Sequence, residues 1–494
     1  MELQSAAERV PVEIWCDIFP LALETWLLPG DGGDILKSLL LFRRGCESVE
    51  EYARVENIRK SLRAVCRIWK DAVDSLSIDL TLSDFAANTA PAECYLPRSK
   101  RIEFLPGWSC HCRQCPDIFS IDPDRRQREV CRLREISPHK FAHTHSSLHP
   151  MSARIILLHL QRQDMAEYVH SAPCLAAFQG NICNIYRGEG LGVKAIFDRL
   201  THLTLLALSP LEMKSAYQFP RLRFLAIFLD MGYSSKPPED DYVALWRWRL
   251  PKLVSLVIRG AVSKVYREDL RLFLYSRSST LGGLLLNYRD YTVEGFRAIL
   301  TETNLFRRFS RLRTLGINIH TLGNFAGDIN SDERETWRPR TTLPICETLL
   351  LEDIHNMIEF HPNRLQLWAQ QCLWTCARPA GLFHRIIMVH SWDELGQLFE
   401  NYIKRQVKYR AEGEFAYGFY PQLSFPRMFF LLIYEEPNIE FVDRNNVELR
   451  EGNGITFWEK IRSMETDPGI LGSDLDADVV AGRWRFRETL ARGT

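Results

Sequence analysis

Four segments of this chain share one apolar pattern, and that pattern limits the folds open to the sequence. Each reads apolar-x-x-Leu-x-x-Leu-x-apolar, and they span residues 200–208, 219–227, 250–258 and 309–317. In the second and third segments proline follows the first apolar residue. Proline fixes φ and so favours a turn before a strand. Weaker copies lie at 280–286, 343–351, 383–389 and 425–433. The pattern predicts short buried strands, spaced by about twenty to thirty-five residues, which is the spacing of leucine-rich solenoids.

Helical patterns lie between several of these predicted strands. Apolar residues near Asp269 recur with helical spacing, Thr292 is a suitable N-cap for 293–300, and Ser391 with Glu394 forms a capping box before a longer helix. Strands alternating with helices, in units too small to bury their own apolar faces, predict an irregular, horseshoe-like solenoid. An ordinary α/β domain with a parallel sheet gives the same alternation and remains the alternative.

A second pattern, in two halves, lies near the start of the chain. The first half is Val10-Pro11-Val12-Glu13-Ile14-Trp15-Cys16-Asp17-Ile18-Phe19, and the second is Leu62-Arg63-Ala64-Val65-Cys66-Arg67-Ile68-Trp69-Lys70-Asp71. Pro11 suits the opening turn of a helix, where its missing N–H is not needed. Apolar residues recur at helical intervals in both halves, so each half predicts an amphipathic helix.

Taken together, the two halves resemble an F-box, whose family pattern is roughly Leu-Pro-x-Glu-Ile-x-x-x-Ile-Phe followed by Val-Cys-Arg-x-Trp-Arg. Val10 and Lys70 depart from that pattern, and about thirty residues separate the halves. The resemblance implies a helical module that binds the Skp-type adaptor of a cullin ubiquitin ligase. The residues expected to form its core and its adaptor-binding face are Val10, Pro11, Ile14, Ile18, Phe19, Leu62, Val65, Cys66 and Trp69.

The leucine-rich part resembles the degenerate repeat regions that follow fungal F-boxes, although its repeats lack the asparagine of regular leucine-rich units. The expected fold is therefore α/β, with an N-terminal helical F-box followed by an irregular leucine-rich-repeat solenoid. Residues 1–85 would form the F-box with an insert at 29–60, residues 86–436 the solenoid, and residues 437–494 a cap and a weakly ordered tail. A hairpin is expected around residues 451–454, where glycines lie between apolar residues.

Composition narrows the possible partners and the expected location. Lys+Arg and Asp+Glu both number 62, so no overall field favours nucleic acid or an anionic membrane. No apolar run approaches the roughly twenty residues that cross a bilayer, and the N-terminus lacks the pattern of a signal peptide. With 13 cysteines and no such signal, reduced thiols in the cytoplasm or nucleus are expected.

One cluster carries the residue types of a metal site. Cys110, Cys112 and Cys115 lie close together, with Cys131 and four histidines (139, 143, 145 and 149) downstream. Zinc binds four thiolate or imidazole ligands, usually in two close pairs, but these pairs are too far apart for a compact finger. No bound metal and no cofactor are expected. The glycines at 188–192 and the aspartates at 474–478 lack the residues of a phosphate loop or a calcium loop.

No motif of a hydrolase, kinase or metalloprotease is present, so no enzyme activity is expected. The sequence instead predicts a substrate-recognition subunit of an SCF-type ubiquitin ligase, which binds the adaptor, through it a cullin, and an unknown protein target. The target is expected to contact the exposed arginines of the strand starts, Arg221, Arg223, Arg311 and Arg313, in a row with His202, Thr204, Lys252 and Ser255. The alternatives are a leucine-rich scaffold outside ubiquitin transfer and a zinc-dependent nucleic-acid-binding module.

Overall fold

The computed structural model of the 494-residue chain divides into two compact units. Unit 1 comprises residues 1–228 and 240–255, and unit 2 comprises residues 229–239 and 256–494. The structure describes residues 10–25, 29–42, 46–75, 156–160, 176–180, 197–208, 217–230, 245–261, 267–287, 308–317, 346–352, 384–411, 434 and 438–463.

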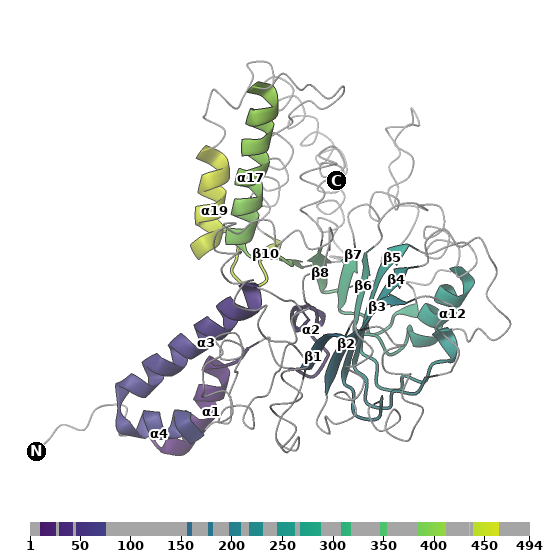
Figure 1. Cartoon of the computed structure of the whole chain (residues 1–494), viewed down its shortest axis with the longest axis horizontal. Coiled ribbons are helices and arrows are strands. Elements are labelled where there is room, and N and C mark those ends of the chain that lie inside the picture. The colour runs from purple at the N-terminus through teal and green to yellow at the C-terminus, as the bar shows by residue number, and fades with distance from the viewer. Residues whose placement is uncertain are drawn as a thin grey trace, which may run out of the picture. The chain divides into compact units, whose positions relative to one another are not determined.

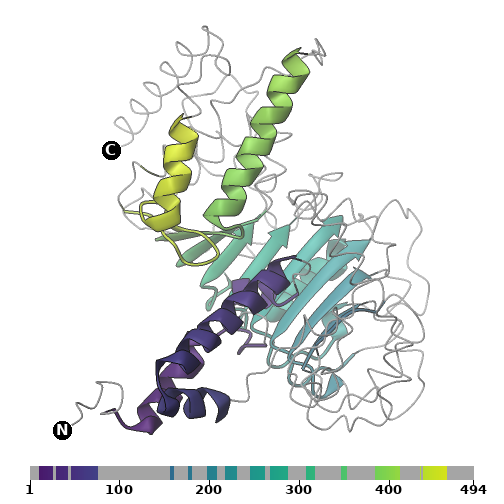
Figure 2. The same ribbon diagram turned by 60° about the vertical axis from the view of Figure 1, so that its left-hand side comes forward.

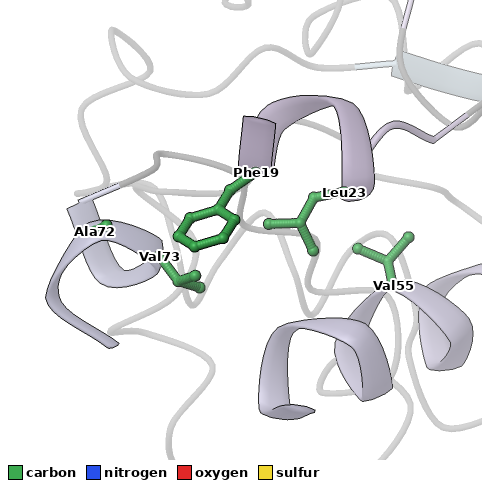
Figure 3. Close-up of a cluster of buried hydrophobic side chains, with 5 residues drawn as sticks. All are labelled: Phe19, Leu23, Val55, Ala72 and Val73. Carbon is green, nitrogen blue, oxygen red and sulfur yellow. The ribbon is translucent and has the colours of Figure 1, made fainter. Parts of the chain in front are cut away.

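Unit 1 begins with four helices, α1 (Val12–Ala22), α2 (Ile35–Leu40), α3 (Cys46–Val65) and α4 (Arg67–Ser75). Pro11 occupies the N-cap position of α1, and its carbonyl oxygen accepts a hydrogen bond from the N–H of Ile14 at 3.1 Å. Helices α1, α3 and α4 enclose a small apolar core of Phe19, Leu23, Val55, Ala72 and Val73 (Figure 3). All three helices lie close together in both overall views (Figures 1 and 2).

Unit 1 also contains strands β1 (Ile156–Leu160), β2 (Ala177–Gly180), β3 (His202–Leu208) and the start of β4 (Phe224–Asp230), with a 3-10 helix η6 (Leu245–Arg247). The strands lie in chain order, and β1, β2 and β3 pair in parallel. The connections before β4 and β5 each contain a β-turn. In these turns the N–H of Leu222 donates to Phe219 O, and that of Leu253 donates to Leu250 O, both at 3.3 Å.

Residues 29–42, which we call the α2 segment, pack against the starts of strands in unit 1. The hydroxyl of Ser255 donates a hydrogen bond to the carbonyl oxygen of Gly32 at 2.8 Å. The ring of Phe42 stacks on Phe224 with the centroids 6.0 Å apart. Asp34 caps α2 through a hydrogen bond from the N–H of Lys37 to Asp34 Oδ1. Residues 35–40 other than Lys37 are buried, so this part of the expected insert belongs to the interior of unit 1.

Unit 2 holds β5 (Ser255–Ala261, with Ser255 itself in unit 1), α12 (Arg267–Arg277), β6 (Gly283–Asn287), β7 (Thr314–Ile317), β8 (Thr348–Leu351), β9 (Arg385–Met388), α17 (Trp392–Ala411), β10 (Glu440–Val442) and α19 (Gly452–Ser463). The strands again follow chain order, and β6 to β10 pair in parallel. Their register aligns one buried apolar residue from each strand. This row is Leu284, Leu315, Leu349, Ile386 and Phe441.

Helices α17 and α19 lie side by side in both overall views (Figures 1 and 2). The predicted capping box at the start of α17 is confirmed. The N–H of Ser391 donates to Glu394 Oε2 at 2.9 Å, and the N–H of Glu394 donates to Ser391 Oγ at 3.2 Å. Buried Trp392 contacts Phe441 and Phe457, with ring centroids 5.4 and 5.2 Å apart, and so joins α17 to β10 and α19.

The specific fold prediction is wrong, although the α/β class holds. The described strands form all-parallel sheet structure with helices, and no leucine-rich-repeat solenoid is evident. The strands do not recur at one period, because β1 and β2 begin at Ile156 and Ala177, whereas β9 and β10 begin at Arg385 and Glu440. The Leu-x-x-Leu pattern predicted the turn and the strand that follows it. That combination occurs in any parallel α/β domain, which was the alternative.

The predicted helical F-box is not evident either. The second half of the motif was expected to form one helix with a continuous apolar stripe, but Cys66 separates α3 from α4. Helix α3 also begins at Cys46, within the expected insert of 29–60, and continues to Val65. The expected hairpin at residues 451–454 is wrong as well, because residues 452–463 form α19. Two glycines near this position made the pattern look like a turn, yet the apolar residues after it repeat with helical spacing.

Candidate protein-interaction surface

Helix α1 is apolar on two sides. One side faces the small core, where Phe19 and Leu23 are fully buried and Trp15 and Cys16 are partly buried. The other side carries Ile14, Ile18 and Leu21, spaced at i, i+4 and i+7, and all three are exposed. The carboxylates Glu13 and Asp17 are also exposed. A helix with two apolar sides is normally buried on both, so the exposed side of α1 is a candidate interaction surface.

The two halves of the sequence motif meet in the core of this helical group. The rings of Trp15 and Trp69 lie 4.5 Å apart between centroids, and the rings of Phe19 and Trp69 lie 5.1 Å apart. Leu62 and Ile58 of α3 pack against the same core. Aromatic pairs at these distances add to the free energy gained from apolar burial. The aromatic residues of the motif therefore hold the helices together.

Several other apolar residues in and beside the motif are exposed. We call them the outer apolar surface, which comprises Val12, Ile14, Ile18 and Leu21 of α1, Val65 at the end of α3 and Ile68 of α4. These side chains are between 37% and 72% exposed. Among the described residues, six of the nine large exposed hydrophobic side chains belong to this surface. Exposed apolar residues are otherwise scattered singly, so this concentration makes the helical group a candidate interaction site.

Charged side chains of both signs occur on the same helices. Arg67 and Lys70 of α4 are exposed, as are Glu13 and Asp17 of α1. Arg63 is paired with Asp74 at 3.0 Å, an ion pair that joins α3 to α4. The helical group therefore exposes charges of both signs as well as apolar side chains, and protein-binding surfaces commonly combine the two.

The predicted adaptor-binding residues thus separate into two groups. Phe19 is buried, and partly buried Leu62 and Trp69 pack against the same core, whereas Cys66 is partly buried at the break between α3 and α4. Pro11, Ile14, Ile18 and Val65 are exposed, and Val10 is half-buried at the start of α1. Sequence reasoning missed Val12, Leu21 and Ile68. Helical spacing was the signal for the last two, since Leu21 follows Ile14 by seven residues and Ile68 follows Val65 by three.

The predicted target-binding arginines are exposed at strand starts. Arg221 and Arg223 precede β4 in unit 1, and Arg311 and Arg313 precede β7 in unit 2. Lys252 before β5 is exposed as well. The prediction that His202, Thr204 and Ser255 also face outward is wrong, because all three are buried. Ser255 is covered by Gly32 of the α2 segment, and the ring of His202 stacks on that of Phe224 at 5.8 Å.

His202 is the buried residue of this group with the most perturbed chemistry. Its pKa is lowered from 6.5 to about 4, chiefly by burial and to a smaller extent by the positive charge of Arg223, while the carboxylate of Asp31 partly opposes both. Its Nδ1 lies 3.0 Å from the hydroxyl oxygen of Thr201. That hydroxyl donates its hydrogen to the carbonyl oxygen of Ala176, so it accepts from Nδ1–H of a neutral imidazole. His202 is therefore an uncharged, structural residue at neutral pH.

Several other predicted features fall outside the residues that the structure describes. These are the cysteine and histidine cluster of 110–149, the glycines at 188–192 and the aspartates at 474–478. Within the described ranges, no group of three or more His, Cys, Asp or Glu side chains is arranged to hold a metal ion. No described helix combines the length and apolarity required to span a membrane.

Comparisons of this chain with protein families, with curated proteins and with solved structures found no match.

Proposed function

We propose that this chain is a substrate-receptor subunit of an SCF-type ubiquitin ligase. Its N-terminal helices bind a Skp-type adaptor, and its sheet-containing region binds the protein to be modified. The observation that carries the proposal is the coincidence of two features. The residues that resemble the F-box pattern include Pro11, Ile14, Ile18 and Val65, and these same residues are exposed on the helical group.

Burial of the outer apolar surface would supply the free energy of adaptor binding. Full burial of one Val, Leu or Ile side chain contributes about 1.5–3 kcal/mol. Ile14, Ile18 and Leu21 lie on one side of α1, where a single partner groove could cover all three. The core residues of the motif contribute indirectly, because Phe19, Trp15 and Trp69 fix α1 against α4 and so hold the exposed residues in place.

No catalytic residue is required for such a role. A receptor subunit accelerates ubiquitin transfer by holding its target near the charged conjugating enzyme, which raises the effective concentration of the reacting groups. The target would contact the exposed strand-start arginines of each unit, Arg221 with Arg223 and Arg311 with Arg313.

Adaptor capture by surface variants tests this proposal. The full chain is co-expressed with a Skp-type adaptor and purified through a tag on the chain. The variant Ile14→Asp/Ile18→Asp introduces two carboxylates into the outer apolar surface and is expected to reduce adaptor capture at least tenfold. Ile455→Asp is the matched control, because Ile455 is 40% exposed on α19 in unit 2, comparable with the 47% of Ile14. It is expected to capture as much adaptor as the unchanged chain.

Circular dichroism and the unfolding midpoint establish that each variant is folded. Wild-type capture by folded Ile14→Asp/Ile18→Asp would contradict the assignment. Cullin in the same purification distinguishes the two roles that an adaptor-binding chain can have. Adaptor with cullin supports the ligase receptor, whereas adaptor without cullin supports a scaffold outside ubiquitin transfer.

A further inference from the structure

Two connecting segments of unit 1 run side by side and carry a row of positive charge. Residues 217–223 lead into β4, and residues 245–254 lead into β5. Their exposed cations form what we call the basic strip: Arg221, Arg223, Arg247, Arg249 and Lys252. Trp246, which is 41% exposed, lies in the same stretch, and the guanidinium of Arg247 lies 5.3 Å from the centre of its ring.

Backbone hydrogen bonds fix the two segments against each other. The N–H of Phe219 donates to Arg249 O at 3.0 Å, and the N–H of Arg249 donates to Tyr217 O at 2.9 Å. Further along, the N–H groups of Val254 and Ser255 both donate to Arg223 O at 2.9 Å. Because Arg223 is next to Val254, Arg221 and Lys252 occupy neighbouring positions, about 5 Å apart at the backbone.

The β-turns before β4 and β5 determine the positions of Arg221 and Lys252. Arg221 and Lys252 are each the third residue of a β-turn whose second residue is proline, in Phe219–Leu222 and in Leu250–Leu253. Proline favours the second position of such a turn, so the sequence presets both turns. The cations are therefore held at fixed positions on the backbone before any ligand arrives.

A buried aromatic layer supports the strip from below. Tyr217, Phe219 and Trp248 are all buried. Trp248 lies 4.9 Å from Tyr217 and 5.9 Å from Phe219 between ring centroids, and Phe219 lies 4.6 Å from Phe197. The three aromatic side chains are thus on the buried side of the two segments, and the five cations of the strip are on the exposed side. Such packing limits the movement of the backbone that carries the cations.

Among the described residues, the cations of the strip are not paired with acidic side chains, although the carboxylate of Asp31 in the α2 segment lies near Arg223, since both act on His202 and the neighbouring Gly32 packs against the Cβ of Arg223. Neither segment contains an aspartate or glutamate. Within the part of the chain that the structure describes, the side chains of Arg221, Arg223, Arg249 and Lys252 form no ion pair. Like charges on neighbouring strands are destabilising, and a chain with 62 acidic residues has ample means to pair them. The unpaired cations are therefore positioned for a ligand of opposite charge.

We infer that the basic strip binds a phosphorylated segment of a partner protein, with the phosphate between Arg221 and Lys252. A phosphoserine or phosphothreonine carries close to two negative charges and three acceptor oxygens, which suits two adjacent cations and the planar fork of arginine. Arg223, Arg247 and Arg249 meet acidic residues beside the phosphate, and Trp246 contacts an apolar side chain. This inference deepens the proposed function, and it rests on that function only in identifying the phosphorylated partner as the ligase target.

A nucleic acid is the competing polyanion, and two observations disfavour it. The chain as a whole has no net positive charge, and the strip contains five cations. Nucleic-acid-binding surfaces neutralise many phosphates along an extended face. A compact strip with one exposed aromatic ring matches a short phosphorylated peptide better.

Binding to paired peptide libraries tests the inference without knowledge of the target. The full-length chain is applied to an array of peptides with randomised flanks around a central phosphoserine, and to the same array without phosphate. We expect at least tenfold stronger retention on the phosphorylated array. The Arg221→Glu/Lys252→Glu variant is expected to lose that preference. The control is Lys60→Glu, which reverses one exposed charge on α3 in unit 1, outside the strip. It is compared with the single variant Arg221→Glu, which reverses one charge within the strip.

The outcomes separate this inference from the proposed function. Equal retention on both arrays, or an unchanged preference in folded Arg221→Glu/Lys252→Glu, would overturn it. Tighter binding of a 20-nucleotide oligouridine than of any phosphopeptide would assign the strip to nucleic acid and overturn it as well. Adaptor capture is measured on the same preparations. Ile14→Asp/Ile18→Asp is expected to lose adaptor binding but to retain phosphopeptide binding. Arg221→Glu/Lys252→Glu is expected to lose phosphopeptide binding but to retain adaptor binding.

Discussion

Trp15 of α1 and Trp69 of α4 contact each other with their ring centroids 4.5 Å apart and their planes inclined by 57°. The two residues belong to opposite halves of the sequence motif, and Phe19 contacts both. The contact brings the two halves together in the fold although they are far apart in sequence. The aromatic residues occupy the inside of the helical group, whereas their sequence neighbours Ile14, Ile18 and Ile68 are exposed on its outside.

Substitution of Phe19 should therefore reduce stability and not only binding. The side chain is fully buried between α1, α3 and α4 (Figure 3), and Phe→Ala changes in such positions cost about 3–5 kcal/mol. We expect Phe19→Ala to unfold the helical group at much lower urea concentration than the unchanged chain, measured by hydrogen exchange in residues 12–22 and 46–75. Leu21→Ala removes a side chain that is 72% exposed and should leave exchange unchanged. Equal protection in both variants would contradict the observed core.

The helical group illustrates what the sequence could and could not predict. Periodicity predicted that residues after Pro11 and around Trp69 are helical, and both predictions are confirmed. It could not predict the break at Cys66, because the apolar stripe continues across it from Leu62 to Val73. Periodicity also could not predict that Phe19 is buried in the core whereas Ile18 is exposed. Both are apolar and adjacent, and only the position of α3 and α4 determines which of the two is buried.

The depressed pKa of His202 predicts a loss of stability in mild acid. In the unfolded chain the imidazole has its ordinary pKa near 6.5, whereas in the folded chain the pKa is about 4. Between these values the unfolded state binds a proton that the folded state does not. The free energy of unfolding is therefore unaffected by this group well above pH 6.5 and falls as the pH decreases towards 4. At pH 5 it is about 2 kcal/mol lower than at high pH.

Hydrogen exchange of β3 amides at pH 7 and pH 5 measures this effect, after correction for the intrinsic dependence of exchange on pH. The unchanged chain is expected to lose protection at pH 5, whereas His202→Gln, which cannot be protonated, should lose less. Equal losses in both would show that His202 does not control acid stability. Substitution of nearby Arg223 by Gln should reduce the effect, because the Arg223 charge contributes to the lowered pKa.

Cys346 should be the least reactive of the described thiols. Burial, with a smaller contribution from the carboxylate of Glu347, raises its pKa to about 12, and the residue is 3% exposed. The thiolate is the reactive form, so at pH 8 its fraction falls by about a thousandfold relative to an ordinary thiol. We expect iodoacetamide to label Cys16 and Cys66, which are partly exposed, well before Cys346. Peptide mass spectrometry gives the three rates, and comparable rates would contradict the burial of Cys346.

The capping box of α17 offers a test of local helix stability in unit 2. Ser391 and Glu394 satisfy each other's backbone N–H groups, so Ser391→Ala should cost about 1 kcal/mol. The change is expected to increase hydrogen exchange in the first turns of α17. Ser463→Ala at the end of α19 removes a bond to the carbonyl oxygen of Lys460, an exposed contact within the last turn of the helix, and should have a smaller effect. This motif was fully visible in the sequence, because its two members lie three residues apart.

The α2 segment, unlike the capping box, could be predicted only in part from the sequence. Its helix could be predicted from the apolar residues after Asp34, but its packing site could not. Ser255, which donates to Gly32 O, lies 223 residues further along the chain. Nothing in a single sequence links residues so far apart. The sequence therefore predicted only an insert of the helical module at 29–60, whereas the α2 segment covers strand starts in unit 1.

Substitution of Gly32 tests whether this packing is essential. Gly32 has φ of +75°, and a Cβ atom there would lie 2.6 Å from the Cβ of Arg223. The left-handed conformation alone costs an L-residue about 1–2 kcal/mol, and the overlap with Arg223 adds to it. Gly32→Ala should therefore displace the loop, break the hydrogen bond from Ser255 and expose Phe42. Gly30→Ala is the matched control, since Gly30 has no atom within 4 Å of its Cβ position. We expect a lower unfolding midpoint and faster exchange of β3 and β4 amides in Gly32→Ala only. If the two alanine variants behaved alike, the α2 segment would be an accessory to unit 1 and not part of its interior.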